Sequence, residues 1–213
     1  MAAFGLVYDK YLAKGMLAAN PYCMRVLEHH LLPSTSVYVA FRNNEIIATV
    51  TLIGDGELGL PMDGIHPEVT QAARDEGLYV GEVSCLAFRQ QELKDVLPVF
   101  IELTRLMSQA ARANGMQQYL IGCIPRHARF YTRFLGFQQV GGLRPYPTVC
   151  DTMGVACCLD FARIDVERPD CYVRYFSEQL PAAALKTVPM SQFEREAFSR
   201  VIHHSPQQLL QMV

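Results

Sequence analysis

Between residues 78 and 124, a strand-like segment, a long helical segment and a second strand-like segment follow one another. Residues 78–88 (LYVGEVSCLAF) and 117–124 (QQYLIGCI) are apolar and rich in strand formers, whereas residues 95–114 carry apolar side chains at helical spacing. A strand, a crossover helix and a second strand in one sheet make the two strands parallel. This order indicates an α/β class of fold.

The flanking segments add antiparallel strands. Residues 36–42 and 45–53 are rich in β-branched and aromatic side chains, and the Asn-Asn pair between them is a two-residue hairpin signal. A helix is expected at 126–135, closed by a glycine, and a last strand at 153–161. The fold class predicted is therefore α/β (α+β), with a mixed central sheet and helices on both faces.

The two ends of the chain extend this core. We expect two short helices within residues 6–32, the second opened by an Asn-Pro pair, and a short helix opened by Pro67. Past residue 165 the pattern weakens to short surface helices. The domains predicted are a main domain at 1–163, with a helical cap at 1–34, and a C-terminal helical extension at 164–213.

Composition excludes several classes of protein. The 213 residues carry a net charge of −2, so general attraction to nucleic acid is absent, and no nucleic-acid partner is expected. The seven cysteines form no metal-binding spacing, so no metal is expected. We find neither a signal peptide nor an apolar run of membrane-spanning length, and we expect a cytoplasmic protein with no transmembrane segment.

Four ordered segments carry a resemblance to a known family. They are LGLPMD at 58–63, EVSCLAF at 82–88, PRHARFYTRFLGF at 125–137 and GGLRPYPTV at 141–149. Together they resemble the N-acyl amino acid synthases of the FeeM type, within the GCN5-related N-acetyltransferase (GNAT) and acyl-homoserine lactone synthase-like fold. The resemblance implies an N-acyltransferase that moves a long-chain fatty acyl group from acyl carrier protein to the α-amine of an amino acid.

One departure from the broader fold bears on the acyl donor. Acetyltransferases that use acetyl-CoA place a glycine-rich loop after the central strand, where backbone N–H groups meet the pyrophosphate. Here that stretch reads RQQELKDVLP and contains no glycine. We therefore expect no tightly bound cofactor, and as co-substrate the acyl-phosphopantetheine of acyl carrier protein, with acyl-CoA as the alternative.

The resemblance also implies catalytic residues. Glu82, a carboxylate in an apolar strand, has the raised pKa that suits a base, although a buried glutamate paired with an arginine is the alternative. Tyr131 matches the tyrosine that protonates the leaving thiolate, or it is a core aromatic. The backbone N–H groups of Cys85 and Leu86 are the expected oxyanion donors. A buried, structural thiol is favoured for Cys85 itself over a covalent acyl-enzyme.

Substrate binding is expected from polar groups near the strand ends. An arginine fork suits the carboxylate of an amino acid, so Arg126 and Arg144 are candidates, each with a solvated surface role as the alternative. Asp63 either orients the amine or stabilises a turn. The full set of candidate substrate-binding residues is Asp63, Ser84, Ala87, Arg126, His127 and Arg144. The spacing of Arg126, Arg129 and Arg133 on one helix suits an acidic carrier protein, and a solvated helix face is the alternative.

Two other functions fit the same residues. The first is an acyl-CoA-dependent acetyltransferase or an acyl-homoserine lactone synthase, and the absence of tryptophan argues against the latter. The second is a module without catalysis that binds an acyl chain or acyl carrier protein. The presence of both Glu82 and Tyr131 favours an active enzyme.

Overall fold

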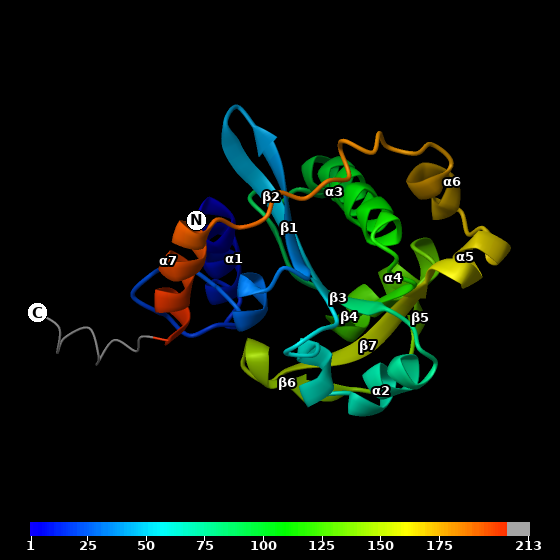
Figure 1. The fold of residues 1–213 in the computed structure, drawn as a ribbon, viewed down its shortest axis with the longest axis horizontal. Helices are drawn as coiled ribbons and strands as arrows, with labels where there is room; N and C mark the ends of the chain where they lie inside the picture. The colour runs from blue at the N-terminus through cyan, green and yellow to red at the C-terminus, as the bar shows by residue number, and fades with distance from the viewer. Residues whose placement is uncertain (204–213) are drawn as a thin grey trace, which may run out of the picture.

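The computed structural model describes residues 1–203, which build a seven-stranded mixed sheet with helices on both faces (Figure 1). The strands are β1 (Thr35–Arg42), β2 (Glu45–Gly54), β3 (Val80–Phe88), β4 (Gln118–Cys123), β5 (Gln138–Gln139), β6 (Arg144–Tyr146) and β7 (Thr152–Asp160). The helices are α1 (Ala2–Leu12), η1 (Glu28–Leu31), η2 (Pro61–Gly64), α2 (Pro67–Asp75), α3 (Leu93–Ala113), α4 (Pro125–Phe134), η3 (Pro147–Val149), α5 (Phe161–Glu167), α6 (Cys171–Phe176) and α7 (Gln192–His203).

The predicted hairpin is confirmed. Strands β1 and β2 pair antiparallel, and the two turn residues, Asn43 and Asn44, have φ of 51° and 63°. Positive φ at both central positions defines the type I′ turn, which asparagine tolerates better than other residues with a side chain. The Asn-Asn pair therefore fixes the register of this edge of the sheet.

The predicted crossover is also confirmed, and it places the two central strands side by side. The sheet order is β1-β2-β3-β4-β7-β5, with β6 paired to β7, and only β3 and β4 run parallel within it. Their pairing extends from Val80 opposite Gln118 to Val83 opposite Ile121. Beyond that point the two strands separate, which opens space between them.

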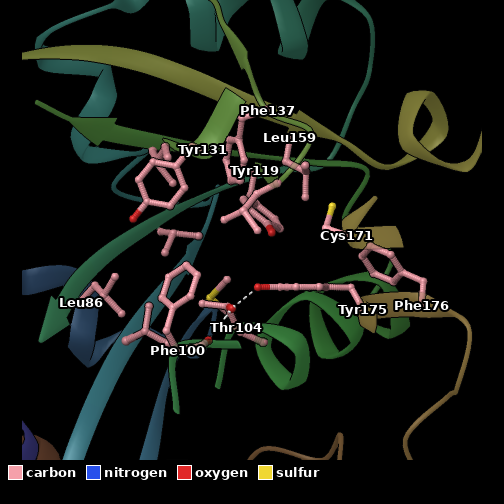
Figure 2. Close-up of a pocket in the computed structure, with 15 residues that line it drawn as sticks. Leu86, Phe100, Thr104, Tyr119, Tyr131, Phe137, Leu159, Cys171, Tyr175 and Phe176 are labelled. Carbon is pink, nitrogen blue, oxygen red and sulfur yellow. Dashed lines mark hydrogen bonds between the residues drawn. The ribbon is translucent and has the colours of Figure 1, made fainter. Parts of the chain in front are cut away.

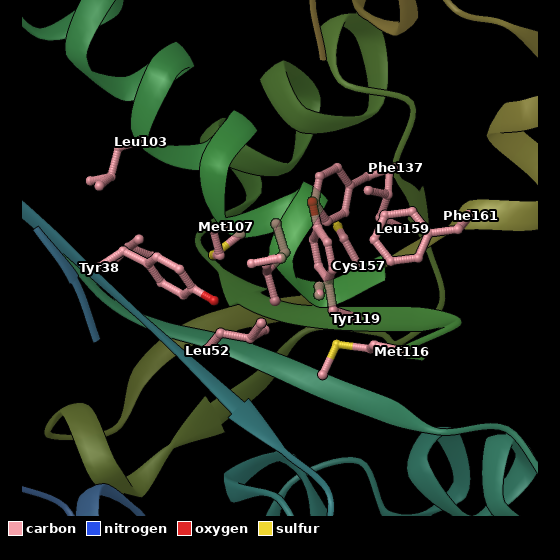
Figure 3. Packing of buried hydrophobic residues seen from close by; sticks show 14 of the residues in the cluster. Tyr38, Leu52, Leu103, Met107, Met116, Tyr119, Phe137, Cys157, Leu159 and Phe161 are labelled. Atoms are coloured by element: carbon pink, nitrogen blue, oxygen red, sulfur yellow. The ribbon is translucent and has the colours of Figure 1, made fainter. Parts of the chain in front are cut away.

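Each face of the sheet has its own apolar layer. On one face, α3 packs over β1 and β2, and Met107 meets a cluster that includes Tyr119, Phe137 and Leu159 (Figure 3). Helix α1 packs on β2 and β3 from the opposite side, and η2 and α2 cover the neighbouring strands (Figure 1). The space between β3 and β4 is thus enclosed from both sides.

The N-terminal prediction is partly wrong. The first helix begins at Ala2, and Asn20 does not open a second one; instead, its side chain accepts from Tyr22 N–H at 3.1 Å and donates to the carbonyl of Met24 at 3.0 Å. These bonds stabilise a turn, which competes with helix for asparagine. Between α1 and β1 the only helical turn is the short η1, in which His30 is buried and hydrogen-bonded to Thr51.

The C-terminal helices are more than surface features. The boundary expected between residues 163 and 164 lies inside α5, and Tyr175 of α6 and Phe198 of α7 are buried. Phe198 packs edge-on against Phe4 of α1, with ring centroids 4.8 Å apart, so the last described helix lies beside the first (Figure 1). The end of the expected extension, 204–213, lies outside the described residues. Over 1–203 no helix is long and apolar enough to cross a bilayer.

Candidate active site

An irregularity in β3 lies where the parallel strands separate. Opposite β2, Thr49 pairs with Ala87 and Thr51 pairs with Ser84, so Cys85 and Leu86 together face a single residue, Val50. Cys85 has φ of 54°. This is a β-bulge, which bends a strand and redirects its groups. The bulge lies at Cys85 and Leu86, whose N–H groups are the oxyanion donors predicted from the sequence.

A cavity of about 220 Å³ borders the bulge and contains most of the polar groups expected at an acyl-transfer site. Glu82, Ser84, Cys85 and Leu86 of β3 line it. The other walls come from β4 and from α1, α4, η1 and η3 and their flanking loops, with Ile121, Tyr11, Tyr131, His29 and Val149 among them. Residues far apart in the sequence therefore meet at the gap between β3 and β4.

Glu82 is buried, with 5 % of its surface exposed, and its Oε2 accepts a hydrogen bond from Met62 N–H at 2.7 Å. Burial raises the pKa of Glu82 to about 8; the Met62 N–H opposes this shift and the nearby Asp63 adds to it. Among the described residues no arginine forms an ion pair with Glu82, so the pairing considered as an alternative is not what holds it. A carboxyl group with this pKa takes up a proton readily near neutral pH.

Tyr131 stands between the cavity and the apolar face of the sheet. Its ring packs against Phe137 and Phe100, at centroid distances of 5.4 and 6.5 Å, so it is part of the aromatic cluster as well. Burial raises the pKa of Tyr131 far above its usual value, which keeps the phenol protonated. It also lines the cavity, so both sequence interpretations, core aromatic and proton donor, fit its position.

The thiol of Cys85 is in a poor environment for a nucleophile. The side chain is 2 % exposed, and burial raises its pKa, which suppresses the thiolate. Its neighbour Ser84 donates a long hydrogen bond to the sulfur, at 3.7 Å. These features favour the structural role predicted for this side chain.

Arg25 is the main site residue that sequence reasoning missed. Its side chain lines the cavity while the residue is only 7 % exposed, it donates from Nη2 to the carbonyl of Thr148 at 2.9 Å, and its guanidinium lies over the ring of Tyr11, 5.1 Å from the centroid. Within residues 1–203 its Nε has no hydrogen-bond partner and no carboxylate forms an ion pair with it. Arg25 is also the only lysine or arginine between residues 15 and 41, which is the one signal the sequence offered.

His29 is a second missed residue. It lines the same cavity, and its Nε2 is buried without a hydrogen-bond partner in the described part of the chain. Burial lowers its pKa, so the imidazole is neutral at physiological pH. A neutral imidazole in the cavity that Arg25 also lines adds a polar group without adding charge.

Asp63 lies behind Glu82 and does not line the cavity. Both of its carboxylate oxygens accept from Arg74, at 3.0 and 2.8 Å, and one also accepts from Leu60 N–H. Arg74 binds Asp55 in the same two-pronged way. Although burial acts against it, the bonds from Arg74 lower the pKa of Asp63. Through η2, this network positions the Met62 N–H that holds Glu82.

The other predicted arginines lie outside the cavity. Arg144 is exposed, donates to the carbonyl of Ile65 at 2.6 Å and forms an ion pair with Glu68 at 3.0 Å. Arg126 and His127 are exposed at the start of α4, where Lys14 is close enough to contribute to the lowered pKa of His127, after burial and Arg126. Neither arginine is placed to hold an acceptor inside the cavity.

Two further cavities meet the central one. An apolar pocket of about 40 Å³ lies on the α3 side and shares Val83, Leu86, Ile121 and Tyr131 with it (Figure 2). A groove of about 640 Å³ between α1 and the start of α3 shares Leu86 and Tyr11, and Ala87 lines it. Leu86 borders all three spaces, which places the groove, the cavity and the pocket around the bulge.

A mixed sheet with two parallel strands that separate at a bulge, beside a buried carboxyl group and a protonated tyrosine, defines the class. This is a GNAT-like architecture. The family model described as "N-acyl amino acid synthase FeeM" matches residues 2–160, and the chain belongs to this family. The protein is therefore an N-acyltransferase.

Solved structures agree with this assignment. FeeM, an N-acyl amino acid synthase from uncultured soil microbes, is 25 % identical over 84 % of this chain and 94 % of its own, with a TM-score of 0.64. The acyl-homoserine lactone synthases LasI (12 % identity, TM-score 0.59) and MesI (14 %, 0.56) share the fold, each aligned over 84 % of this chain and 87 % of theirs. No curated protein sequence matches the chain.

Proposed function

We propose that this N-acyltransferase moves a fatty acyl group from the phosphopantetheine of acyl carrier protein to the α-amine of an amino acid. The observation that carries the proposal is the meeting of groove, cavity and apolar pocket at Leu86, with Glu82 in the central cavity. The groove suits the pantetheine arm, the pocket suits the acyl chain, and the polar cavity suits the acceptor.

The reaction follows from this arrangement. The amine nitrogen of the acceptor bonds to the thioester carbonyl carbon, and Glu82 takes the proton that the nitrogen loses. Backbone N–H groups at Cys85 and Leu86 stabilise the oxyanion. The C–S bond then breaks, and the thiolate takes a proton from Tyr131. An amide and a free pantetheine thiol leave, and the proton held by Glu82 returns to Tyr131 through water.

Arg25 supports an acceptor that carries a carboxylate. A buried guanidinium without an acidic partner is costly, and a bound carboxylate would relieve that cost through charge-assisted hydrogen bonds. A bound carboxylate would relieve no such cost at Arg126 or Arg144, because Arg126 is exposed to solvent and Arg144 is already paired with Glu68. We therefore assign the carboxylate contact to Arg25.

The donor proposal rests on charge at the mouth of the groove. Lys10, Lys14 and Arg89 line it, and Lys10 Nζ donates to the carbonyl of Arg89 at 2.9 Å. Residues 89–98, which follow β3 at this groove, contain no glycine-rich loop of the kind that binds a CoA pyrophosphate. A single phosphodiester needs only a few cations. Three arginines of α4, at positions 126, 129 and 133, extend the basic surface toward an acidic carrier.

The function is tested by supplying acyl carrier protein loaded with a fatty acyl group, together with each amino acid in turn, and detecting the N-acyl product by mass. We expect an amide product with at least one amino acid and faster transfer from the carrier than from acyl-CoA. Absence of any amide, with intact thioester remaining, contradicts the proposal. Equal rates from both donors contradict only the choice of donor.

The acceptor contact has its own test. In Arg25→Gln, the KM for the amino acid should rise about tenfold or more, the cost of losing hydrogen bonds to a charged group. The KM for the corresponding amino-acid amide, which lacks the carboxylate, should change little. Arg105→Gln is the matched control, because Arg105 is mostly buried but contacts Glu102 and Glu178 away from the cavity. An unchanged preference for the acid in Arg25→Gln removes Arg25 from the site.

A further inference from the structure

The apolar pocket is closed by an element from the C-terminal extension. Three of its lining residues, Cys171, Tyr175 and Phe176, belong to α6, which lies beyond the range 2–160 that the family model matches. We infer that α6 sets the length of the acyl chain that this enzyme accepts, with Tyr175 as the wall that the chain meets. This inference rests on the proposed function, because it assigns the apolar pocket to the acyl group.

Helix α6 is fixed to α3 by a buried side chain. Gln109 of α3, 7 % exposed, donates to the carbonyls of Tyr175 at 2.6 Å and Glu178 at 3.0 Å, and its Oε1 accepts from Leu180 N–H at 2.7 Å. One amide thus satisfies three backbone groups of the segment that ends α6. A six-residue helix has little stability of its own, so this bonding positions it.

The ring of Tyr175 is held across the pocket. Thr104 donates its hydroxyl hydrogen to the carbonyl of Phe100 at 2.6 Å, which leaves its oxygen to accept from the hydroxyl of Tyr175 at 2.7 Å. Burial raises the pKa of Tyr175 to about 12, so this donor stays protonated. The hydroxyl groups of Thr104 and Tyr175 thus both have hydrogen-bond partners within the protein. They place no unpaired polar group in the pocket.

The direction of the pocket makes this ring the far wall. Leu86 and Tyr131, which border the central cavity, lie at one end, and Cys171, Tyr175 and Phe176 lie at the other; the side chain of Tyr175 reaches from α6 toward Thr104 (Figure 2). A chain that enters beside Leu86 therefore approaches Tyr175. The enclosed volume of about 40 Å³ holds about three water-sized groups. Removing the ring is the direct way to lengthen the pocket.

The test compares kcat/KM along a series of saturated acyl thioesters of increasing length. In Tyr175→Ala the optimum should move to longer chains, with the ratio of long to short donors raised about tenfold or more, as expected for added methylene contacts. Tyr175→Phe keeps the wall and should keep the wild-type optimum. Cys171→Phe narrows the same end and should move the optimum to shorter chains. Val173→Ala, on the exposed side of α6, is the matched control.

The ratio of kcat/KM values is taken within one preparation, so a reduced folded fraction in a variant cancels. Binding of N-acyl amino acids of different lengths, measured by calorimetry, gives a second readout that needs no turnover. An unchanged optimum in both Tyr175→Ala and Cys171→Phe overturns the inference. If the wild type forms a product with none of the amino acids, the proposed function is contradicted instead. The dependence of binding on chain length then still tests the role of α6.

Discussion

At the scale of single residues, desolvation matters more than ion pairing. Glu82 has one strong partner, the N–H of Met62, and its raised pKa is mainly the result of burial. Tyr131 is kept protonated by the same effect. The central cavity therefore contains two groups able to exchange protons, Glu82 from β3 and Tyr131 from α4, and the proposed reaction uses this pair.

Glu82 predicts the pH dependence of the reaction. With a pKa of about 8, the carboxyl group is mostly protonated at pH 7, so kcat/KM should rise with pH and level off above 8. Glu82→Gln should lower kcat by about a hundredfold or more and abolish this rise. The measurement is a pH profile at saturating donor for both proteins. A variant that retains the wild-type profile shows that another group is the base.

The same residue predicts a gain in stability on mutation. In the unfolded chain Glu82 ionises near 4.5, whereas in the folded protein it stays protonated to about 8. Between these values the folded state binds the extra proton, so rising pH favours unfolding, by up to about 1.4 kcal/mol per pH unit. Glu82→Gln removes this term. Urea unfolding should show the variant more stable than the wild type at pH 8 and nearly equal at pH 4.5; the reverse order contradicts the burial of a protonated carboxyl group.

At the scale of elements, short irregular segments position the groups that the regular ones supply. Strand β3 carries Glu82, but the turn η2 provides its hydrogen bond, and η2 is anchored through Asp63 to Arg74 of α2. The bulge at Cys85 and the end of the β3–β4 pairing at Val83 likewise border the central cavity. The central cavity therefore lies where the regular pairing of β3 with its two neighbouring strands is interrupted.

The anchoring of η2 can be tested without touching the cavity. Arg74→Gln leaves Asp55 and Asp63 without their cation, so we expect a loss of about 1–3 kcal/mol in the free energy of unfolding. The uncompensated charge of Asp63 should also raise the pKa of Glu82 further and move the pH profile of kcat/KM upward. Arg74→Lys keeps the positive charge, so it should lose less stability than Arg74→Gln and shift the pH profile less. A stability loss with an unmoved profile would make the network purely structural.

The basic mouth of the groove predicts a dependence on the carrier. Lys14→Glu should lower kcat/KM with acyl carrier protein several-fold, through slower association, and the effect should fade at high salt. The rate with an acyl-pantetheine donor that lacks the phosphate and the carrier should stay the same. Lys186→Glu, equally exposed on the C-terminal extension, is the control. Equal effects of the two variants indicate a general effect of charge and no docking at the groove.

At the scale of the whole molecule, the first and last described helices, α1 and α7, meet on the side of the sheet opposite α3. Phe4 of α1 contacts both His30 and Phe198, each at a centroid distance of 4.8 Å. Because α1 also lines the groove, α7 packs against a helix that borders this groove. Segments beyond the range 2–160 that the family model matches therefore lie next to two of the cavities, α7 through α1 at the groove and α6 at the apolar pocket.

Packing at this contact predicts a large stability difference between two phenylalanines of one helix. Phe198→Ala should lower the free energy of unfolding by about 3–5 kcal/mol, because its buried ring leaves a cavity. Phe193→Ala, whose side chain is 81 % exposed, should change it by less than about 0.5 kcal/mol. Thermal or urea unfolding of both variants measures the difference. Similar small values for both would show that α7 is not held on α1.

The sequence predicted what depends on local pattern and missed what depends on distant contacts. The Asn-Asn hairpin, the crossover and the candidates Glu82 and Tyr131 follow from periodicity, turn chemistry and the family motifs. Arg25 was missed because only the folded chain shows that it is buried without an acidic partner. For the same reason Asp63 and Arg144 looked available for substrate, although each is already bound to a neighbour of opposite charge.

The contact between α1 and α7 also orders events during synthesis. The ribosome makes α1 before the strands of the sheet and α7 after them, so the packing around Phe4 stays incomplete until α7 has emerged. A nascent chain that has already formed β3 and β4 still lacks the contact between Phe198 and Phe4 of α1, the helix that lines the groove. The α1 wall of the groove therefore gains its full support only after α7 has folded onto it.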